Sequence, residues 1–119
     1  MNHDMNLNHN AFEEIIAKKK KREYRLNDVK RRKVKIGDTI TFHDLEDSSK
    51  MIVVEVEELL IYTDWYTCYK DFFEEDLSAY YENIEQAVKD TYENWWAKEK
   101  EQEFGCLIIK FKFLNAIKE

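Results

Sequence analysis

Residues 18–28 read KKKKREYRLND, and this stretch decides how the rest of the chain is interpreted. Within it, Tyr24 and Leu26 fall on one side of an alternating pattern, and Glu23 and Arg25 fall on the other. Successive side chains of a β-strand point to opposite faces, so this alternation indicates a half-buried strand. We expect Tyr24 and Leu26 in the core, and Glu23 and Arg25 together on an open face.

A short helix is expected just before this strand, over residues 10–19. Phe12, Ile15 and Ile16 repeat at helical spacing. Two glutamates occupy its first turn and lysines follow its last, which is the arrangement that the helix macrodipole favours. Lys20 then falls at the turn between this helix and the strand.

Two further strands are expected in the middle of the chain. Gly37 can adopt a positive φ, which predicts a turn over residues 36–38 that leads into the first of them. The second is a run rich in β-branched residues. Its apolar residues change from one face to the other midway: Ile52, Val54 and Val56 share one face, and Leu59 and Ile61 share the opposite face. This change predicts a bulge or barrel corner near Glu57 and Glu58.

Two helices and a final strand complete the expected elements. Asp64 is placed to cap the first helix, and Asn83 with Gln86 resembles a capping box for the second. The second helix carries an apolar stripe that runs to Trp96. The expected strands cover residues 22–26, 39–43, 51–61 and 107–113, and the helices lie near residues 10–19, 65–73 and 84–96.

These elements predict an α+β fold in which a curved sheet of about five to six strands closes partly into a small barrel, with about three helices around it. The length of 119 residues suits one domain, residues 1–119. The chain has only two glycines and no alternation of strands and helices typical of nucleotide-binding α/β folds. A glycine-rich phosphate loop is therefore excluded.

The charge is unevenly distributed along the chain. Residues 18–35 hold eleven lysines and arginines against two acids, although the net charge of the whole is -6. Residues 1–50 have a net charge of +3, and residues 51–119 have -9. A protein that coats long nucleic-acid duplexes is expected to be basic throughout, so this pattern favours a small or single-stranded polyanionic partner.

Other site classes have little support in the sequence. The two cysteines, Cys68 and Cys106, stand far apart, and the three histidines lack the spacing of a metal site. The longest apolar run is interrupted by glutamates, and no signal peptide or membrane span is expected. We therefore expect a cytoplasmic protein without metal or cofactor that is a monomer or weak homodimer.

The basic stretch resembles the signature of the ASCH domain family, which has the pattern G-x-K-x-x-E-x-R. Lys20, Glu23 and Arg25 match it, and Lys18 stands in place of the usual glycine. The turn at residues 36–38 and the ending that follows Glu103 also resemble family members, so the resemblance covers nearly the whole chain. It implies a PUA-like barrel. Because of Lys18, we expect the turn there to use a different backbone conformation from the family's.

The resemblance further implies a cleft, lined by the motif, that binds RNA or a nucleotide-like ligand. Lysines and arginines of the basic stretch would neutralise phosphates, and tyrosines would supply stacking surfaces for unpaired bases. On residues alone, such charges on a surface strand are usually a solvated ladder of ion pairs, and the resemblance favours a site instead. The expected ligand-binding residues are Lys18, Lys20, Arg22, Glu23, Arg25, Asn27, Lys30, Arg31 and Arg32.

Two alternatives remain open. One small relative in the family is an amidohydrolase that removes acetyl from acetylcytidine, and other relatives are described as ribonucleases. If this chain is such a hydrolase, Lys20 and Glu23 are the expected catalytic residues, although the relative has a threonine at the position of Glu23. The second alternative is a protein-interaction domain in which Trp95 and Trp96 dock a partner.

Overall fold

A computed structural model describes residues 1–118 of the chain. The structure divides into two compact units. The first comprises Met1–Glu23, Val34–Leu59 and Ile109–Glu119, and the second comprises Tyr24–Lys33 and Leu60–Ile108. The single domain inferred from chain length stays a prediction, and each unit is described by itself.

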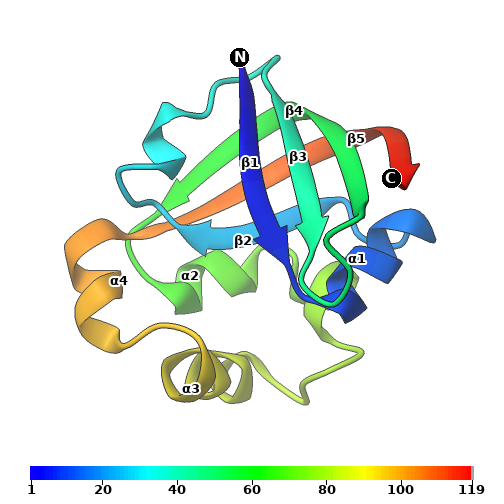
Figure 1. The fold of residues 1–119 in the computed structure, drawn as a ribbon. Helices are drawn as coiled ribbons and strands as arrows, with labels where there is room; N and C mark the ends of the chain where they lie inside the picture. Colours follow the sequence, from blue (N-terminus) through cyan, green and yellow to red (C-terminus); the bar gives the residue numbers. More distant parts are fainter. Residues whose placement is uncertain (119) are drawn as a thin grey trace. The chain divides into compact units, whose positions relative to one another are not determined.

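Five strands form one mixed sheet in the order β1-β3-β4-β5-β2 (Figure 1). β1 pairs parallel to β3, and β3 pairs antiparallel to β4. In this order β1 and β2 each have one neighbouring strand, which agrees with the expected partly closed sheet. The strands are β1 (Asn2–Leu7), β2 (Arg22–Leu26), β3 (Thr39–Asp44), β4 (Lys50–Tyr62) and β5 (Cys106–Lys118).

The helices confirm the α+β class, and α4 is an addition to those inferred from the sequence. It is rich in charged residues and has no side-chain cap, so neither an apolar periodicity nor a capping residue predicts it from the sequence. The helices are α1 (His9–Ile16), α2 (Trp65–Lys70), α3 (Ile84–Asn94) and α4 (Lys98–Phe104), with a 3-10 turn η1 (Arg31–Lys33) and a π-helical turn η2 (Phe73–Leu77).

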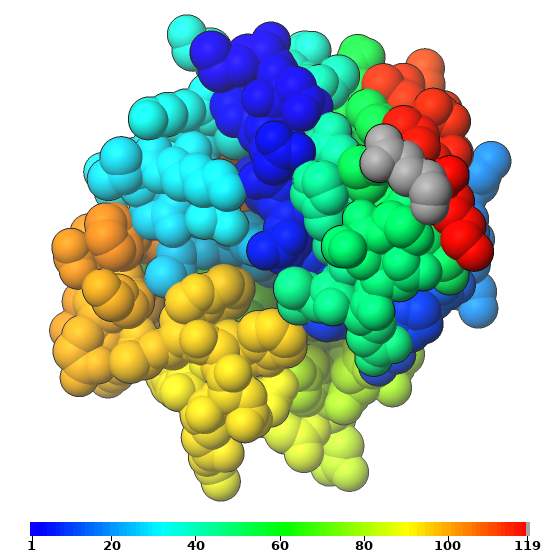
Figure 2. All heavy atoms as spheres, in the orientation of Figure 1, coloured from blue at the N-terminus to red at the C-terminus, as the bar shows by residue number. Residues whose placement is uncertain are grey.

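The core of the first unit is built from alternating strand residues. Ile40 and Phe42 of β3 are fully buried, as are Ile52 and Val54 of β4. β1 follows the same rule, since every second residue from His3 is buried. This strand is not among those predicted from the sequence, because most of its residues are polar. Figure 2 shows its blue atoms running beside the blue-green atoms of β3.

Histidine–aspartate pairs attach the first nine residues to β3 and the turn before it. Each pair joins a residue of the N-terminal segment to one between positions 38 and 44, so all three histidines of the chain are used in this way. The hydrogen bond with Asp44 raises the pKa of His9. The pairs are His3 with Asp38 at 2.8 Å, His43 with Asp4 at 2.9 Å, and His9 with Asp44 at 2.9 Å.

The core of the second unit packs helices against strand ends. Trp65, Cys68 and Tyr69 of α2 join Ala87 of α3 in one buried cluster. Both predicted caps are confirmed, because the side chains of Asp64 and Asn83 accept hydrogen bonds from the third residue of each helix sequence. Cys68 and Cys106 both belong to this cluster, and burial raises the pKa of their thiols.

Two sequence expectations in this unit are wrong. Ile61 is 69% exposed, whereas Leu60 and Tyr62 pack against the buried cluster, so the expected switch of face along β4 does not place Ile61 inside. α3 ends at Asn94, and Trp95 after it is 56% exposed. Apolar character alone does not decide burial, because a few large apolar side chains stay exposed in any fold.

Gly105 stands at a backbone position that only glycine fits. Its φ of 71° and ψ of -169° lie in a region that other residues rarely adopt. A Cβ atom there would lie 2.7 Å from the carbonyl oxygen of Tyr62, at the end of β4. The carbonyl of Gly105 also accepts a hydrogen bond from the amide of Asn27 at 3.0 Å, just beyond β2. The residue thus brings three strand ends close together.

Replacing Gly105 by alanine is expected to destabilise the protein more than replacing Gly37. Both glycines have positive φ, so both variants carry conformational strain of about 1–3 kcal/mol. Only Gly105→Ala adds a backbone clash, because no atom lies within 4 Å of a Cβ at Gly37. Chemical denaturation of the two variants measures the difference, and equal losses of unfolding free energy would contradict it.

Candidate functional site

The structure brings Lys20 and Glu23 together in the first unit. Lys20 lies in the connection after α1 and Glu23 in β2, and Lys20 Nζ is 3.2 Å from Glu23 Oε1. Glu23 is only 6% exposed, so it does not lie on an open face as its alternation suggested. A buried carboxylate requires a partner of opposite charge or hydrogen-bond donors. The ion pair therefore holds the lysine at a defined place.

The remaining residues of the predicted site belong mostly to the second unit. Arg25 is half-buried in β2, two positions after Glu23. Asn27 is buried, and its carbonyl accepts a hydrogen bond from Arg32 Nε at 2.7 Å. Arg31 Nη1 lies 3.3 Å from Asp28 Oδ2. Asn27, Arg31 and Arg32 thus have contacts that shape their own loop, while Arg22 is half-buried in β2 and Lys30 is exposed.

Lys18 keeps the left-handed backbone conformation that glycine would take. Its φ is 61°, and its amide donates to the carbonyl of Ile15 as α1 ends. The amides of Lys19 and Lys20 both donate to the carbonyl of Glu14. These bonds define the turn, and within it Lys18 has a positive φ that glycine adopts without strain. The expected difference from the family's backbone stays a prediction. For a residue with a Cβ, this conformation costs about 1–2 kcal/mol.

A pocket of about 290 Å³ lies beside this turn, and we call it the lysine pocket. Five lysines line it, three from the connection after α1 and two from β5. Phe113 also lines it, and Lys18 Nζ lies 5.6 Å from the centre of its ring. The lining residues are Ile15, Lys18, Lys20, Lys21, Glu57, Lys110, Phe111, Lys112 and Phe113.

Sequence reasoning missed the contribution of β5 to this pocket. Lys110 and Lys112 alternate with apolar residues along the strand, but the sequence does not show which segment lies beside them. The structure supplies that neighbour, because the amide of Phe111 donates to the carbonyl of Lys21 at 3.0 Å. That bond sets the strand beside the connection after α1 and gathers lysines that are about 90 residues apart in the chain.

The chemistry of the lysine pocket favours an anion. Lysine ammonium groups are compact charges with three donors each, and they bind phosphate groups without demanding a planar geometry. Acidic groups are fewer here than the five lysines: Glu57 lines the pocket, Glu58 lies 3.9 Å from Lys110, and Glu23 pairs with Lys20. Within residues 1–118, no group of three or more histidine, cysteine, aspartate or glutamate side chains is arranged to hold a metal ion.

Comparison with known proteins identifies the family of this chain. Residues 5–115 match the model of the ASCH domain family. The chain is similar to the crystal structure of hypothetical protein PH0355, with a TM-score of 0.81, 31% identity, and coverage of 96% of this chain and 100% of that one. It is also similar to the solution NMR structure of protein PF0455 from Pyrococcus furiosus.

For PF0455 the TM-score is 0.73 and the identity 29%, over 97% of this chain and 99% of that one. Neither neighbour is named for a ligand or a reaction. No curated protein matches the chain. As for membranes, none of the helices in residues 1–118 has both the length and the apolar character needed to cross one.

The family match spans most of the chain, and it includes the turn at Lys18 and the ion pair of Lys20 with Glu23. The chain therefore belongs to the ASCH domain family, a PUA-like family thought to bind RNA.

Proposed function

We propose that this protein binds RNA or a nucleotide in the cytoplasm, with the lysine pocket as its phosphate site. The observation that carries the proposal is the gathering of five lysines around one pocket in a chain whose net charge is -6. A pocket lined mainly by one sign of charge concentrates the potential and attracts ligands of the opposite sign. The local charge of the pocket is thus opposite to that of the whole chain.

The ion pair of Lys20 with Glu23 supports a role in orientation. Glu23 is buried and fixed in β2, so its carboxylate limits the positions that the Lys20 ammonium can take. An ammonium with three donors can contact the carboxylate and still bind a phosphate oxygen. In this proposal Lys18 and Lys21 add charge around the same phosphate.

The predicted residues beyond the pocket have different parts in the proposal. Arg22 and Arg25 of β2 contact neighbouring phosphates or base edges, for which the planar guanidinium is suited. Asn27, Arg31 and Arg32 hold the loop after β2 through the hydrogen bonds described above. The pocket volume of about 290 Å³ suits a backbone group of a single strand rather than a duplex.

A hydrolase remains the second candidate, because an amine and a buried carboxylate lie 3.2 Å apart. Such a pair can move a proton to or from a bound substrate, as general acid–base catalysis requires. In hydrolysis of acetylcytidine, water would attack the acetyl carbonyl and release acetate and cytidine. Lys20 and Glu23 would be the catalytic residues.

Removing the two lysines of β5 tests the phosphate site. In Lys110→Ala/Lys112→Ala, binding of a single-stranded RNA is expected to weaken, and the slope of log K against log salt to decrease by about 0.7 for each phosphate that is no longer neutralised. Fluorescence anisotropy with a labelled oligonucleotide at several salt concentrations measures both quantities.

The matched control is Lys89→Ala/Lys98→Ala, which removes the same charge from exposed positions outside the lysine pocket. It should leave the slope nearly unchanged. If the two double variants behave alike, the lysine pocket is not the phosphate site.

Lys18→Gly is expected to separate stability from binding. Glycine relieves the left-handed strain of about 1–2 kcal/mol, and its greater freedom in the unfolded chain costs about 0.5–1 kcal/mol, so the variant should be as stable as the parent or more stable by up to about 1.5 kcal/mol. RNA binding should weaken, because the pocket loses an ammonium group. Denaturation and anisotropy measure the two effects.

Lys19→Gly serves as the comparison for Lys18→Gly, since Lys19 is exposed and does not line the lysine pocket. It should lose stability and keep its affinity for RNA. A Lys18→Gly protein that is clearly less stable than the parent would show that the left-handed turn is not strained.

Incubation with acetylcytidine and with short RNA decides between the hydrolase and the binding protein. A hydrolase should release acetate and cytidine, or shorter RNA fragments, and lose this activity in Lys20→Ala while Lys21→Ala retains most of it. Liquid chromatography with mass spectrometry detects these products. Absence of all products in the parent protein would eliminate both hydrolytic reactions.

A further inference from the structure

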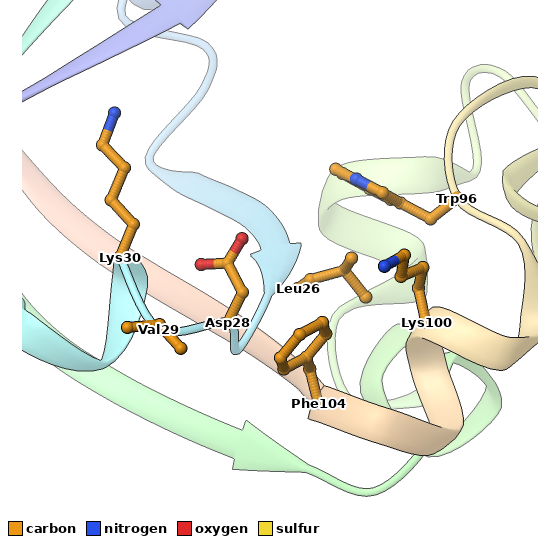
Figure 3. A pocket seen from close by; sticks show the side chains of 7 residues that line it. All are labelled: Leu26, Asp28, Val29, Lys30, Trp96, Lys100 and Phe104. Carbon is orange, nitrogen blue, oxygen red and sulfur yellow. The ribbon is translucent and has the colours of Figure 1, made fainter.

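A second pocket, of about 380 Å³, lies entirely within the second unit, and we call it the aromatic pocket. Figure 3 shows Leu26, Trp96, Lys100 and Phe104 gathered at one end and Lys30 with Val29 at the other. These residues come from the end of β2 and the loop after it, the connection after α3, and α4. None of the residues that line the lysine pocket contributes to it.

The apolar side of the aromatic pocket has a rigid support. The ring of Trp96 stacks on that of Trp65, with centroids 5.3 Å apart and planes 15° apart. Trp65 is fully buried and stacks in turn on Tyr69 at 5.3 Å. Trp96 therefore ends a stack of three rings, and the ring of Trp95 lies tilted against it with centroids 6.2 Å apart. A flat ring held in this way offers its partly exposed surface to another flat ring at little cost in side-chain entropy.

Cations line the pocket at both ends. Lys30 lies at one end, and at the other Lys100 Nζ lies 5.7 Å from the centre of the Phe104 ring. Arg32 does not line the pocket, but its guanidinium lies 5.9 Å from the same ring centre. Asp28 also lines the pocket, but its carboxylate accepts hydrogen bonds from the amide and Nη1 of Arg31. The acid is thus partly neutralised by contacts inside its own loop, which leaves the cations to set the charge of the rim.

Val29 adds apolar surface at the end of the pocket that holds Lys30. It is 64% exposed, in a loop otherwise rich in charged residues. An apolar edge opposite a tryptophan fits a ligand that is flat and apolar in one part and anionic in another.

We propose that the aromatic pocket binds an unpaired nucleotide, with its base stacked on Trp96 and its phosphate held by Lys30 at the opposite end of the pocket. Sequence-tolerant recognition of single strands combines these two features, a stacking platform and a positive groove. A base inside a duplex has no free face for this contact. The nucleotide is either free or part of a single-stranded RNA, and the second case rests on the function proposed above.

Four small probes test the chemistry of the site. Adenosine monophosphate carries both a base and a phosphate, adenosine carries only the base, and ribose 5-phosphate carries only the phosphate. A single-stranded oligonucleotide is the fourth probe. Stacking on Trp96 should quench the tryptophan fluorescence with adenosine monophosphate and with the oligonucleotide, more weakly with adenosine, and not with ribose 5-phosphate.

Neighbouring tryptophans provide a matched pair of variants. Trp96→Leu should weaken nucleotide binding by about 5- to 150-fold, the range that corresponds to loss of one base–aromatic stack. Trp95→Leu changes the exposed neighbour, whose ring contacts that of Trp96 but does not line the aromatic pocket, and it should weaken binding far less than Trp96→Leu. Trp96 packs on the core, so its replacement can also destabilise the fold. Lys30→Glu is therefore tested as well. Lys30 is exposed, and reversing its charge should weaken binding without unfolding the protein.

The binding results distinguish failure of the aromatic pocket from failure of the RNA-binding function. If RNA binds and neither Trp96→Leu nor Lys30→Glu weakens it, the aromatic pocket is not a nucleotide site, although the RNA function stands. If adenosine monophosphate binds through Trp96 and Lys30 but RNA does not bind, the site takes free nucleotides and the RNA function fails. If no probe binds the parent protein, both proposals are overturned.

Discussion

The second unit depends on the absence of a side chain at Gly105. There the chain turns from α4 into β5, and a Cβ atom would lie 2.7 Å from the carbonyl oxygen of Tyr62 at the end of β4. The carbonyl of Gly105 accepts a hydrogen bond from the amide of Asn27, which holds the end of β2 beside it. Phe104 precedes this turn and Leu26 precedes Asn27, which gives the aromatic pocket two of its walls.

In the first unit, a residue with a side chain stands at a turn that also has a positive φ. At the end of α1, a glycine would relieve the left-handed strain, and the chain has Lys18 instead. The backbone conformation is retained because three amides after the helix have partners among its last carbonyls. The strain therefore accompanies an additional ammonium group in the lysine pocket. This is the pattern expected where a local rule is broken at a functional site rather than in the core.

Buried carboxylates connect the elements of each unit. Glu101 accepts hydrogen bonds from the amide of Trp65 at 2.8 Å and from the hydroxyl of Tyr92, and thereby joins α4 to α2 and α3. Burial, with this hydrogen bond, raises the pKa of Tyr92 to about 12. Glu23 has the corresponding position in the first unit with Lys20. Both acids have a partner at the wall of a pocket, but the partner of Glu23 is a cation, whereas Tyr92 is a neutral hydroxyl.

Local signals in the sequence determined β2, the caps at Asp64 and Asn83, the α+β class and the family motif, because periodicity and capping depend on residues a few positions apart. Tertiary structure alone decided that Ile61 is exposed and that Glu23 is buried, since burial depends on what packs against a strand. It also placed Lys110 and Lys112 beside the motif, through a backbone bond between segments about 90 residues apart. Such pairing is set by long-range register, which no local pattern encodes.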